Sequence, residues 1–291
     1  MVYEDIEHNK RNTFFLIFFF ILIITGLGYV LGELYGDPYI WVIAAFVFAI
    51  AYSFTTYYYS DKIVLAITGA KPANQYKHRQ LIISAEGLAL AAGLPKPRVY
   101  VMQGDAINAF ATGRNPKNAV IAVTEGALKK LDKFELEGVI AHELSHIKNF
   151  DILVGTVAAV LVGVVAMLSD YITRSLFWGR GRRSSGGRGG AVIIIIAVLA
   201  AIIAPIAAAL IRFAVSRQRE YLADAQAVLL TRYPKGLIGA LAKIKQDAAV
   251  ENPVSSGMAH MYFNVSNSAA AKQILATHPP IDARIQRLSR M

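Results

Sequence analysis

Two long stretches without a charged residue constrain this chain more than any other feature of its sequence. Residues 12–32 form a stretch of 21 residues dominated by Phe, Ile and Leu, and residues 38–60 form a stretch of 23 residues. Each can cross a bilayer as a helix, because about 20 apolar residues span the hydrocarbon core. Trp41 and the three tyrosines at 57–59 lie near the ends of the second stretch, as aromatic residues do at a membrane interface. We therefore predict two transmembrane helices near the N-terminus.

The composition of the whole chain supports a membrane protein. Hydrophobic residues make up 55% of the 291 residues and charged residues only 17%, whereas about a quarter of a typical soluble chain is charged. The absence of cysteine excludes disulfides, a cysteine nucleophile and thiolate metal sites. The net charge is +10, a basic excess that we assign to a membrane surface. The lipid bilayer is thus an expected partner, and nucleic acid is not.

Two further uncharged stretches interrupt the polar part of the chain. Residues 152–169 are rich in Val, Ala and Gly, and residues 189–211 contain Pro205. Between them, residues 171–190 hold five arginines, six glycines and no acidic residue, a composition typical of a flexible linker. We expect the two stretches to form a hydrophobic hairpin that inserts into the membrane, with burial in a soluble core as the alternative.

The polar segment before this hairpin shows local signals for one helix, three short strands and a second helix. Residues 81–92 have an amphipathic pattern, and segments 98–102, 109–112 and 119–124 are typical of strands. Asp132 followed by Glu135 resembles a capping box, which predicts a helix that begins at Lys133. No break signal follows before Ile152. We therefore expect that helix to run directly into the third uncharged stretch.

A metal-binding motif lies on this second predicted helix. Residues 142–146 read His-Glu-Leu-Ser-His, and residues four apart share one helix face, so His142 and His146 can converge on one metal ion. Glu143, beside the first histidine, can accept a proton from an attacking water. This is the H-E-x-x-H pattern of zinc peptidases. The sequence thus predicts a hydrolytic site with one zinc ion per chain.

A candidate third ligand lies in the second polar segment. Glu220 and Asp224 are four residues apart on a predicted helix and so share a face. Glu220 can complete a three-residue zinc site, and Asp224 can orient a ligand histidine. The alternative for Glu220 is a surface ion pair with a nearby arginine. Because Glu220 and His146 must lie on the same side of the membrane, the two intervening stretches must both cross it or both stay out.

These two segments together resemble a known family. HELSH at 142–146 and SRQREYLAD at 216–224 resemble the HtpX family of membrane zinc metallopeptidases, which is related to the CAAX prenyl-protein endopeptidases. The segments at 108–113 and 277–280 and the two N-terminal hydrophobic stretches also resemble the family pattern, in the same order and over nearly the whole chain. The resemblance implies that His142, His146 and Glu220 bind zinc and that Glu143 is the general base.

The resemblance also implies a biological role and a substrate site. The protein would be a membrane-bound endopeptidase of protein quality control, with misfolded or damaged membrane proteins as substrates. Residues 108–113, with Asn108 and Ala109 at their start, would form an edge strand that receives the substrate backbone. His278 stays open: it would either donate to the oxyanion of the tetrahedral intermediate or be a turn residue before two prolines.

The expected fold is a mainly α-helical membrane protein, with transmembrane helices and a zincin-like catalytic domain that has a small β-sheet. The acidic loop at 33–37 should face outward, which places the site on the cytoplasmic side of a multi-pass protein of the cell membrane. The arginine-rich loop then lies outside, against the positive-inside tendency. The expected divisions are a membrane region at 1–60, catalytic halves at 61–151 and 212–291, and the hairpin at 152–211.

Three alternatives remain at this stage. An intramembrane metalloprotease carries its motif in a hydrophobic helix, whereas four charged residues between 132 and 137 precede this one. The second alternative is a non-enzymatic membrane scaffold or a transporter. Transport predicts ionisable residues inside the spans, and the uncharged stretches hold none. CAAX processing is compatible with the family relation, but four candidate spans are few for a large enclosing chamber. The natural substrate and the oligomeric state do not follow from the sequence.

Overall fold

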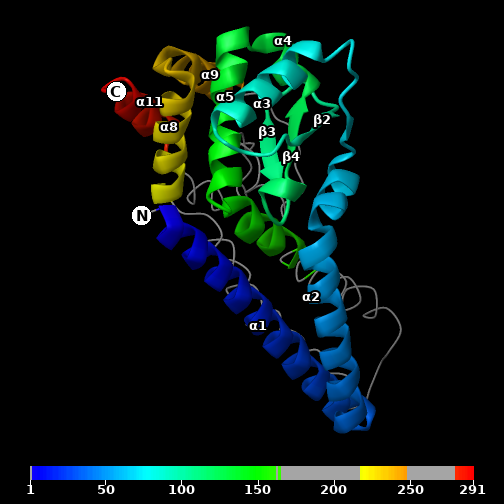
Figure 1. Ribbon diagram of the computed structural model, residues 1–291. Helices are drawn as coiled ribbons and strands as arrows, with labels where there is room; N and C mark the ends of the chain where they lie inside the picture. Colours follow the sequence, from blue (N-terminus) through cyan, green and yellow to red (C-terminus); the bar gives the residue numbers. More distant parts are fainter. Residues whose placement is uncertain (1, 162, 165–216, 248–278) are drawn as a thin grey trace.

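Two long helices extend from one end of a domain built of helices and a small sheet (Figure 1). The structure is a computed structural model that describes residues 2–161, 163–164, 217–247 and 279–291. The predicted stretch at 189–211, the arginine-rich loop at 171–190 and His278 lie outside the described residues.

The long helices are α1 (Val2–Tyr35) and α2 (Pro38–Thr68). Within the described residues they are the two unbroken helices that are apolar and long enough to cross a membrane, with mean hydropathies of 2.7 and 1.8 in their apolar windows. Large apolar side chains stay exposed on both, among them Phe14 at 65% and Phe54 at 62%, as expected of surfaces that lipid covers. The two predicted membrane helices are therefore confirmed as helices, and each is longer than its uncharged stretch.

A four-stranded mixed sheet forms the centre of the domain. Its strand order is β1 (Lys71–Pro72), β2 (Arg98–Met102), β4 (Val120–Thr124) and β3 (Ala109–Thr112). β2 and β4 run parallel, whereas the other two pairs are antiparallel. The three strands predicted from sequence are confirmed, and β3 lies at one edge of the sheet.

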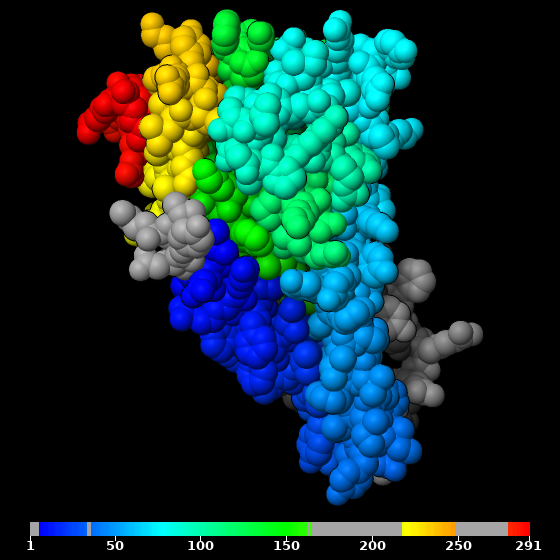
Figure 2. Space-filling model, viewed as in Figure 1, coloured from blue at the N-terminus to red at the C-terminus, as the bar shows by residue number. Residues whose placement is uncertain are grey.

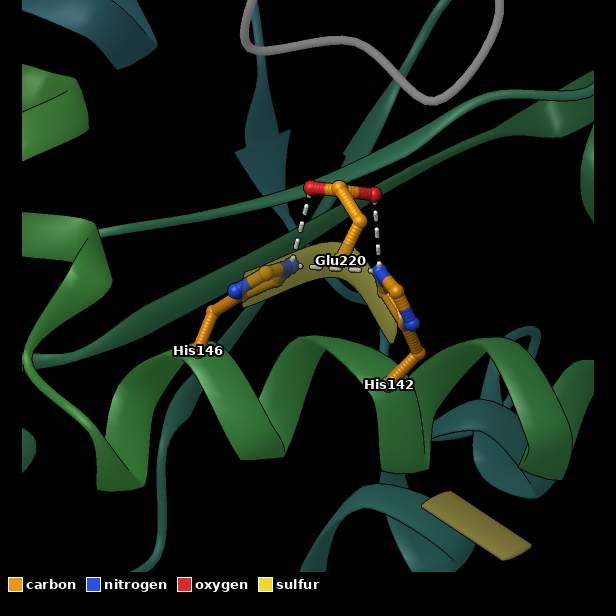
Figure 3. Close-up of side chains that lie close together, drawn as sticks. All are labelled: His142, His146 and Glu220. Carbon is orange, nitrogen blue, oxygen red and sulfur yellow. Dashed lines mark hydrogen bonds and ion pairs between the residues drawn. The ribbon is translucent and has the colours of Figure 1, made fainter. Parts of the chain in front are cut away.

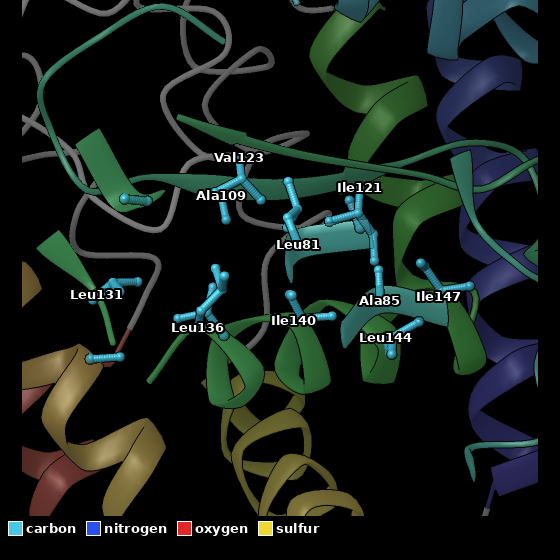
Figure 4. Close-up of a cluster of buried hydrophobic side chains, with 14 of the residues drawn as sticks. Leu81, Ala85, Ala109, Ile121, Val123, Leu131, Leu136, Ile140, Leu144 and Ile147 are labelled. Carbon is cyan, nitrogen blue, oxygen red and sulfur yellow. The ribbon is translucent and has the colours of Figure 1, made fainter. Parts of the chain in front are cut away.

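One face of the sheet is covered by α3 (Arg79–Ala91) and α5 (Lys133–Lys148). Figure 4 shows Leu81 of α3, Ile121 of β4 and Ile140 and Leu144 of α5 meeting in one cluster, where each is at most 1% exposed. The apolar residues of α5 recur at helical spacing, so one stripe of the helix faces the sheet. This packing fixes the rotation of the helix that carries the 142–146 motif.

The start of α5 matches the sequence prediction. The Oδ1 of Asp132 accepts the backbone N–H of Glu135 at 2.9 Å, and the Oε2 of Glu135 accepts the N–H of Asp132 at 2.8 Å. This reciprocal capping box satisfies two donors that the first helical turn leaves without partners.

The end of α5 corrects the prediction. α5 stops at Lys148, and the helix Asp151–Leu161 continues at an angle of 85° to it, so the expectation of one helix running directly into residue 152 is wrong. Phe150 takes a φ of 61° at the break, a left-handed conformation that is uncommon for a bulky residue. The carbonyl of Asn149 accepts the side-chain N–H of Asn9 at 2.9 Å. A tertiary contact, and not a glycine or proline, thus accompanies the break.

The remaining helices lie on the side of α5 away from the sheet (Figure 1). They are α8 (Arg217–Thr231), α9 (Pro234–Asp247) and α11 (Ile281–Leu288). A short helix α4 (Glu125–Lys130) follows β4, and a 3-10 turn (Pro116–Asn118) joins β3 to β4. α5 and α9 approach closely at Gly138, where a Cβ would lie 2.8 Å from the backbone nitrogen of Leu237.

We expect Gly138→Ala to destabilise the domain, because the added methyl group meets backbone atoms of α9 that cannot move independently of the helix. The cost should be about 1–3 kcal/mol, the range for overpacking a close contact. Thermal unfolding of the full chain in detergent measures it. Gly87→Ala in α3 is the matched control, since a Cβ there meets nothing within 4 Å and should be neutral or stabilising. Equal melting temperatures for the two variants would contradict the close approach.

Candidate metal centre

The crossing of α5 and α8 brings three predicted site residues together. Figure 3 shows His142 and His146 on neighbouring turns of α5, with Glu220 of α8 opposite them. The two histidine Nε2 atoms are 3.1 Å apart. The Glu220 carboxylate oxygens lie 3.7 Å from His142 Nε2 and 3.6 Å from His146 Nε2. One donor atom from each residue lies within 4.8 Å of the other two, so the three residues can share one ion.

A carboxylate holds the far nitrogen of each imidazole. Asp224 Oδ1 is 3.0 Å from His142 Nδ1, and Asp151 Oδ2 is 2.9 Å from His146 Nδ1. A carboxylate on Nδ1 fixes the ring orientation and favours the tautomer whose Nε2 can bind a metal. Asp224 thus lies where it could orient a ligand histidine, the role that the sequence analysis expected of it. Asp151 was not predicted from the sequence, because its place beside His146 depends on the helix break.

Arg284 of α11, which is 3% exposed, links the acidic residues of α8. Its Nε and Nη2 donate to the two Asp224 oxygens at 2.9 and 2.6 Å, and its Nη1 lies 3.5 Å from Glu220 Oε2. Burial alone would raise the pKa of Asp224, but hydrogen bonds with His142 and Arg284 outweigh it and hold that pKa below its usual range. Asp224 is thus kept as an anion. No sequence signal marked Arg284 for this role.

The membrane helix α1 reaches the same group of residues. Asn9, which is 1% exposed, donates from Nδ2 to Asp151 Oδ1 at 2.7 Å. Arg219 of α8 donates from Nη1 to Asn9 Oδ1 at 3.0 Å and lies 3.4 Å from Asp151 Oδ1. A side chain near the start of α1 therefore helps to fix the carboxylate that orients His146.

The side chain of Glu143 projects from α5 toward the edge strand β3. Its side chain is buried, and the backbone of Ala111 in β3 hydrogen-bonds to it. Burial raises the pKa of Glu143, while the charges of His146 and His142 lower it, and the balance is a raised pKa. A raised carboxyl pKa suits a group that accepts and returns a proton near neutral pH.

Asn108 and Ala109 lie at the start of the edge strand, as predicted. The side-chain Oδ1 of Asn108 accepts the N–H of Ala109 at 3.0 Å. The backbone carbonyl of Asn108, the residue before β3, accepts the N–H of Thr124 at the end of β4 at 3.0 Å. These bonds hold the edge strand in place beside α5.

The charge around His146 decides how a metal can bind. Burial alone would lower the pKa of His146, but the Asp151 hydrogen bond and the negative charges of Glu220, Asp151 and Glu143 raise it to about 9. A metal ion must therefore displace a proton from this imidazole near neutral pH. The donor set itself fits zinc, whose usual ligands are imidazole nitrogen and carboxylate oxygen, with three protein ligands leaving one position open.

Comparisons with known proteins agree with this arrangement. Residues 75–291 match Peptidase family M48. A Protease HtpX homolog of Dictyoglomus turgidum is 41% identical over 290 residues, which cover 99% of this chain and 94% of the relative. A Protease HtpX homolog of Tropheryma whipplei (strain Twist) is also 41% identical, over 292 residues that cover 100% of this chain and 99% of the relative.

One solved structure is similar in fold. The crystal structure of S. mikatae Ste24p aligns with a TM-score of 0.50 and 23% identity over 91% of this chain. The alignment covers 61% of the Ste24p chain, so this chain spans less than two thirds of that protein's length. At this identity the likeness concerns the fold alone. It supports the predicted zincin-like domain joined to membrane helices.

We expect Asp151→Asn to change how metal affinity depends on pH. In the unaltered chain a proton competes for His146 below its pKa of about 9, so affinity should rise about tenfold per pH unit from pH 7 toward 9. Removing the Asp151 charge lowers that pKa, so the dependence should flatten. At pH 9, affinity should fall roughly 10- to 100-fold, the size expected for a lost partner of a ligand histidine.

Competition with a chromophoric chelator, using the full chain in detergent, measures both quantities. Asp282→Asn is the matched control, because Asp282 pairs with Lys245 on an exposed part of α11. Unchanged pH dependence in Asp151→Asn would show that this carboxylate does not govern His146.

Proposed function

Because the chain belongs to peptidase family M48, we propose that it is a zinc-dependent endopeptidase in which His142, His146 and Glu220 hold the ion. Membership makes the chain a membrane metalloprotease, a hydrolase that works with a bound metal. One observation carries the finer assignment: two imidazoles and a carboxylate meet within 4.8 Å of one another. The carboxylates on both Nδ1 atoms support it, because histidine ligands of zinc are commonly held in this way.

The chemistry divides between the ion and the chain. Zinc, when bound, lowers the pKa of water toward about 7 and polarises the scissile carbonyl. Glu143 is the proposed general base: it takes a proton from the attacking water and delivers it to the leaving amine. Its burial and raised pKa favour this exchange near neutral pH. Asp224 and Asp151 keep the two imidazole rings oriented with Nε2 toward the metal position during the reaction.

The proposed substrate site is the edge of β3 that faces away from β4. This strand is the last in the described sheet, so its outer backbone groups can pair with an extended peptide. The hydrogen bond between Ala111 and Glu143 places the strand beside the proposed base. Asn108 and Ala109 would position the start of the paired segment. Pairing through the main chain reads few side chains, which suits a protease that acts on many damaged proteins.

The proposed substrates are misfolded or damaged membrane proteins, cleaved at the cytoplasmic surface of the cell membrane. The contact between Asn9 of α1 and Asp151 supports a site close to the bilayer. Lys10 and Arg11 lie at this end of α1, whereas Glu33 lies at the other end and Asp37 in the turn that follows it. The positive-inside rule favours the cytoplasm for the basic end.

We expect Glu143→Gln to bind zinc but to lose peptide hydrolysis by at least about 100-fold, because the amide keeps the size and cannot accept the proton. Glu220→Gln should instead lose zinc, since a neutral amide replaces an anionic ligand. Zinc content after dialysis against a mild chelator and casein cleavage in detergent measure the two effects. Glu86→Gln is the control, because Glu86 pairs with Lys96 on the surface of α3.

Normal casein cleavage by Glu143→Gln would overturn its role as base, and full zinc content in Glu220→Gln would place the third ligand elsewhere.

The proposed quality-control role is tested by a separate experiment. A destabilised membrane protein and its stable parent, reconstituted together with the protease, should be cleaved unequally, with the destabilised one cut first. Equal rates would remove that role and leave the hydrolytic assignment intact.

A further inference from the structure

A pocket of about 650 Å³ opens where the membrane helices meet the sheet domain. Lys10 of α1, Tyr57 of α2 and Phe150 at the helix break line it, together with Arg114 and Lys117 from the connection between β3 and β4. In Figure 2 the blue atoms of α1 adjoin the green atoms of the domain in this region. None of the lining residues belongs to the candidate metal group, and the proposed reaction does not use the pocket.

Three cations line the pocket, and the described part of its wall contains no acidic residue. Lys10 Nζ lies 5.1 Å from the ring centre of Phe150, and the Arg114 guanidinium lies 5.0 Å from that of Tyr58. Arg114 Nη1 also donates to the carbonyl of Tyr58 at 3.2 Å, which holds it against α2. Among the described residues, no Asp or Glu lines the pocket or pairs with Lys10, Arg114 or Lys117. Cations gathered around one concave surface attract an anion.

The rest of the pocket wall is apolar. Leu94, Pro95 and Leu153 contribute to it beside the rings of Tyr57 and Phe150. A small inorganic anion has no apolar surface that could pack against this wall. The combination fits an anion that carries an apolar portion.

The position of the pocket along the membrane helices identifies the class of ligand. Lys10 lies two residues before the uncharged part of α1, and Tyr57 lies near the end of the uncharged part of α2. At such positions, near the ends of transmembrane helices, basic and aromatic side chains contact the lipid headgroups. The pocket thus faces the membrane surface on the side of the candidate metal centre.

We propose that this pocket binds the headgroup of an anionic phospholipid. Lys10, Arg114 and Lys117 contact the phosphate and the headgroup, and the apolar wall receives the glycerol and the upper acyl chain. The bound lipid joins α1 and α2 to the domain. It also lies against Phe150, the residue that precedes Asp151, and so supports the helix break that sets the carboxylate beside His146.

Native mass spectrometry of the full chain in neutral detergent, titrated with phosphatidylglycerol or phosphatidylcholine, tests the proposal. Phosphatidylglycerol should bind at least about tenfold more tightly. The triple variant Lys10→Gln, Arg114→Gln, Lys117→Gln should lose this preference, because each cation near a membrane surface contributes roughly fivefold. A control triple variant, Lys71→Gln, Lys129→Gln, Lys235→Gln, has the same charge change outside the pocket and should keep the preference.

An unchanged preference in the pocket variant would overturn the proposal, and so would an equal loss in the control, which would indicate general surface charge. Displacement of the lipid by millimolar inorganic phosphate would identify a phosphate site and would also overturn it. Retained zinc shows that each variant is folded. If the triple variant loses zinc, Lys117→Gln alone provides the test, since this exposed side chain should still cost roughly fivefold in phosphatidylglycerol affinity.

Discussion

Two buried aspartates turn two imidazoles toward one point, and much of the structure serves to hold those aspartates. Asp224 is held by Arg284, and Asp151 by Asn9 and Arg219. Buried charges are costly unless each has a partner, so these contacts are needed together rather than singly. The donors come from α1, α8 and α11, which lie far apart in the sequence. The candidate metal centre is therefore a product of the whole fold and not of the motif helix alone.

The break between α5 and the helix that follows connects this centre to α1. If α5 continued straight, Asp151 would lie a turn beyond His146 and point elsewhere; the 85° bend returns its carboxylate to the imidazole. The same bend exposes the Asn149 carbonyl to Asn9 of α1. The short segment 149–151 thus orients the candidate ligand His146 and fastens helix α1 to the domain. The candidate metal centre is thereby held next to the start of α1.

Local features were predictable from the sequence, and contacts between distant segments were not. The capping box at Asp132 and the four-residue spacing of His142 and His146 depend only on neighbouring residues. The start of α5 and the close approach of the two histidines could therefore be predicted from the sequence. Asn9 and Asp151 were missed because an isolated asparagine or aspartate carries no signal until packing brings the two together. The break at Phe150 was missed because it lacks glycine and proline, the residues that normally mark one.

The position of a bound metal ion would show directly whether His142, His146 and Glu220 share it. Crystals of the full chain grown with zinc, measured on both sides of the zinc absorption edge, should give one anomalous peak per chain. We expect that peak about 2.0–2.2 Å from the Nε2 atoms of His142 and His146 and from a Glu220 oxygen. A zinc peak held by other residues, or one that His142 and His146 bind while Glu220 turns away, would contradict it.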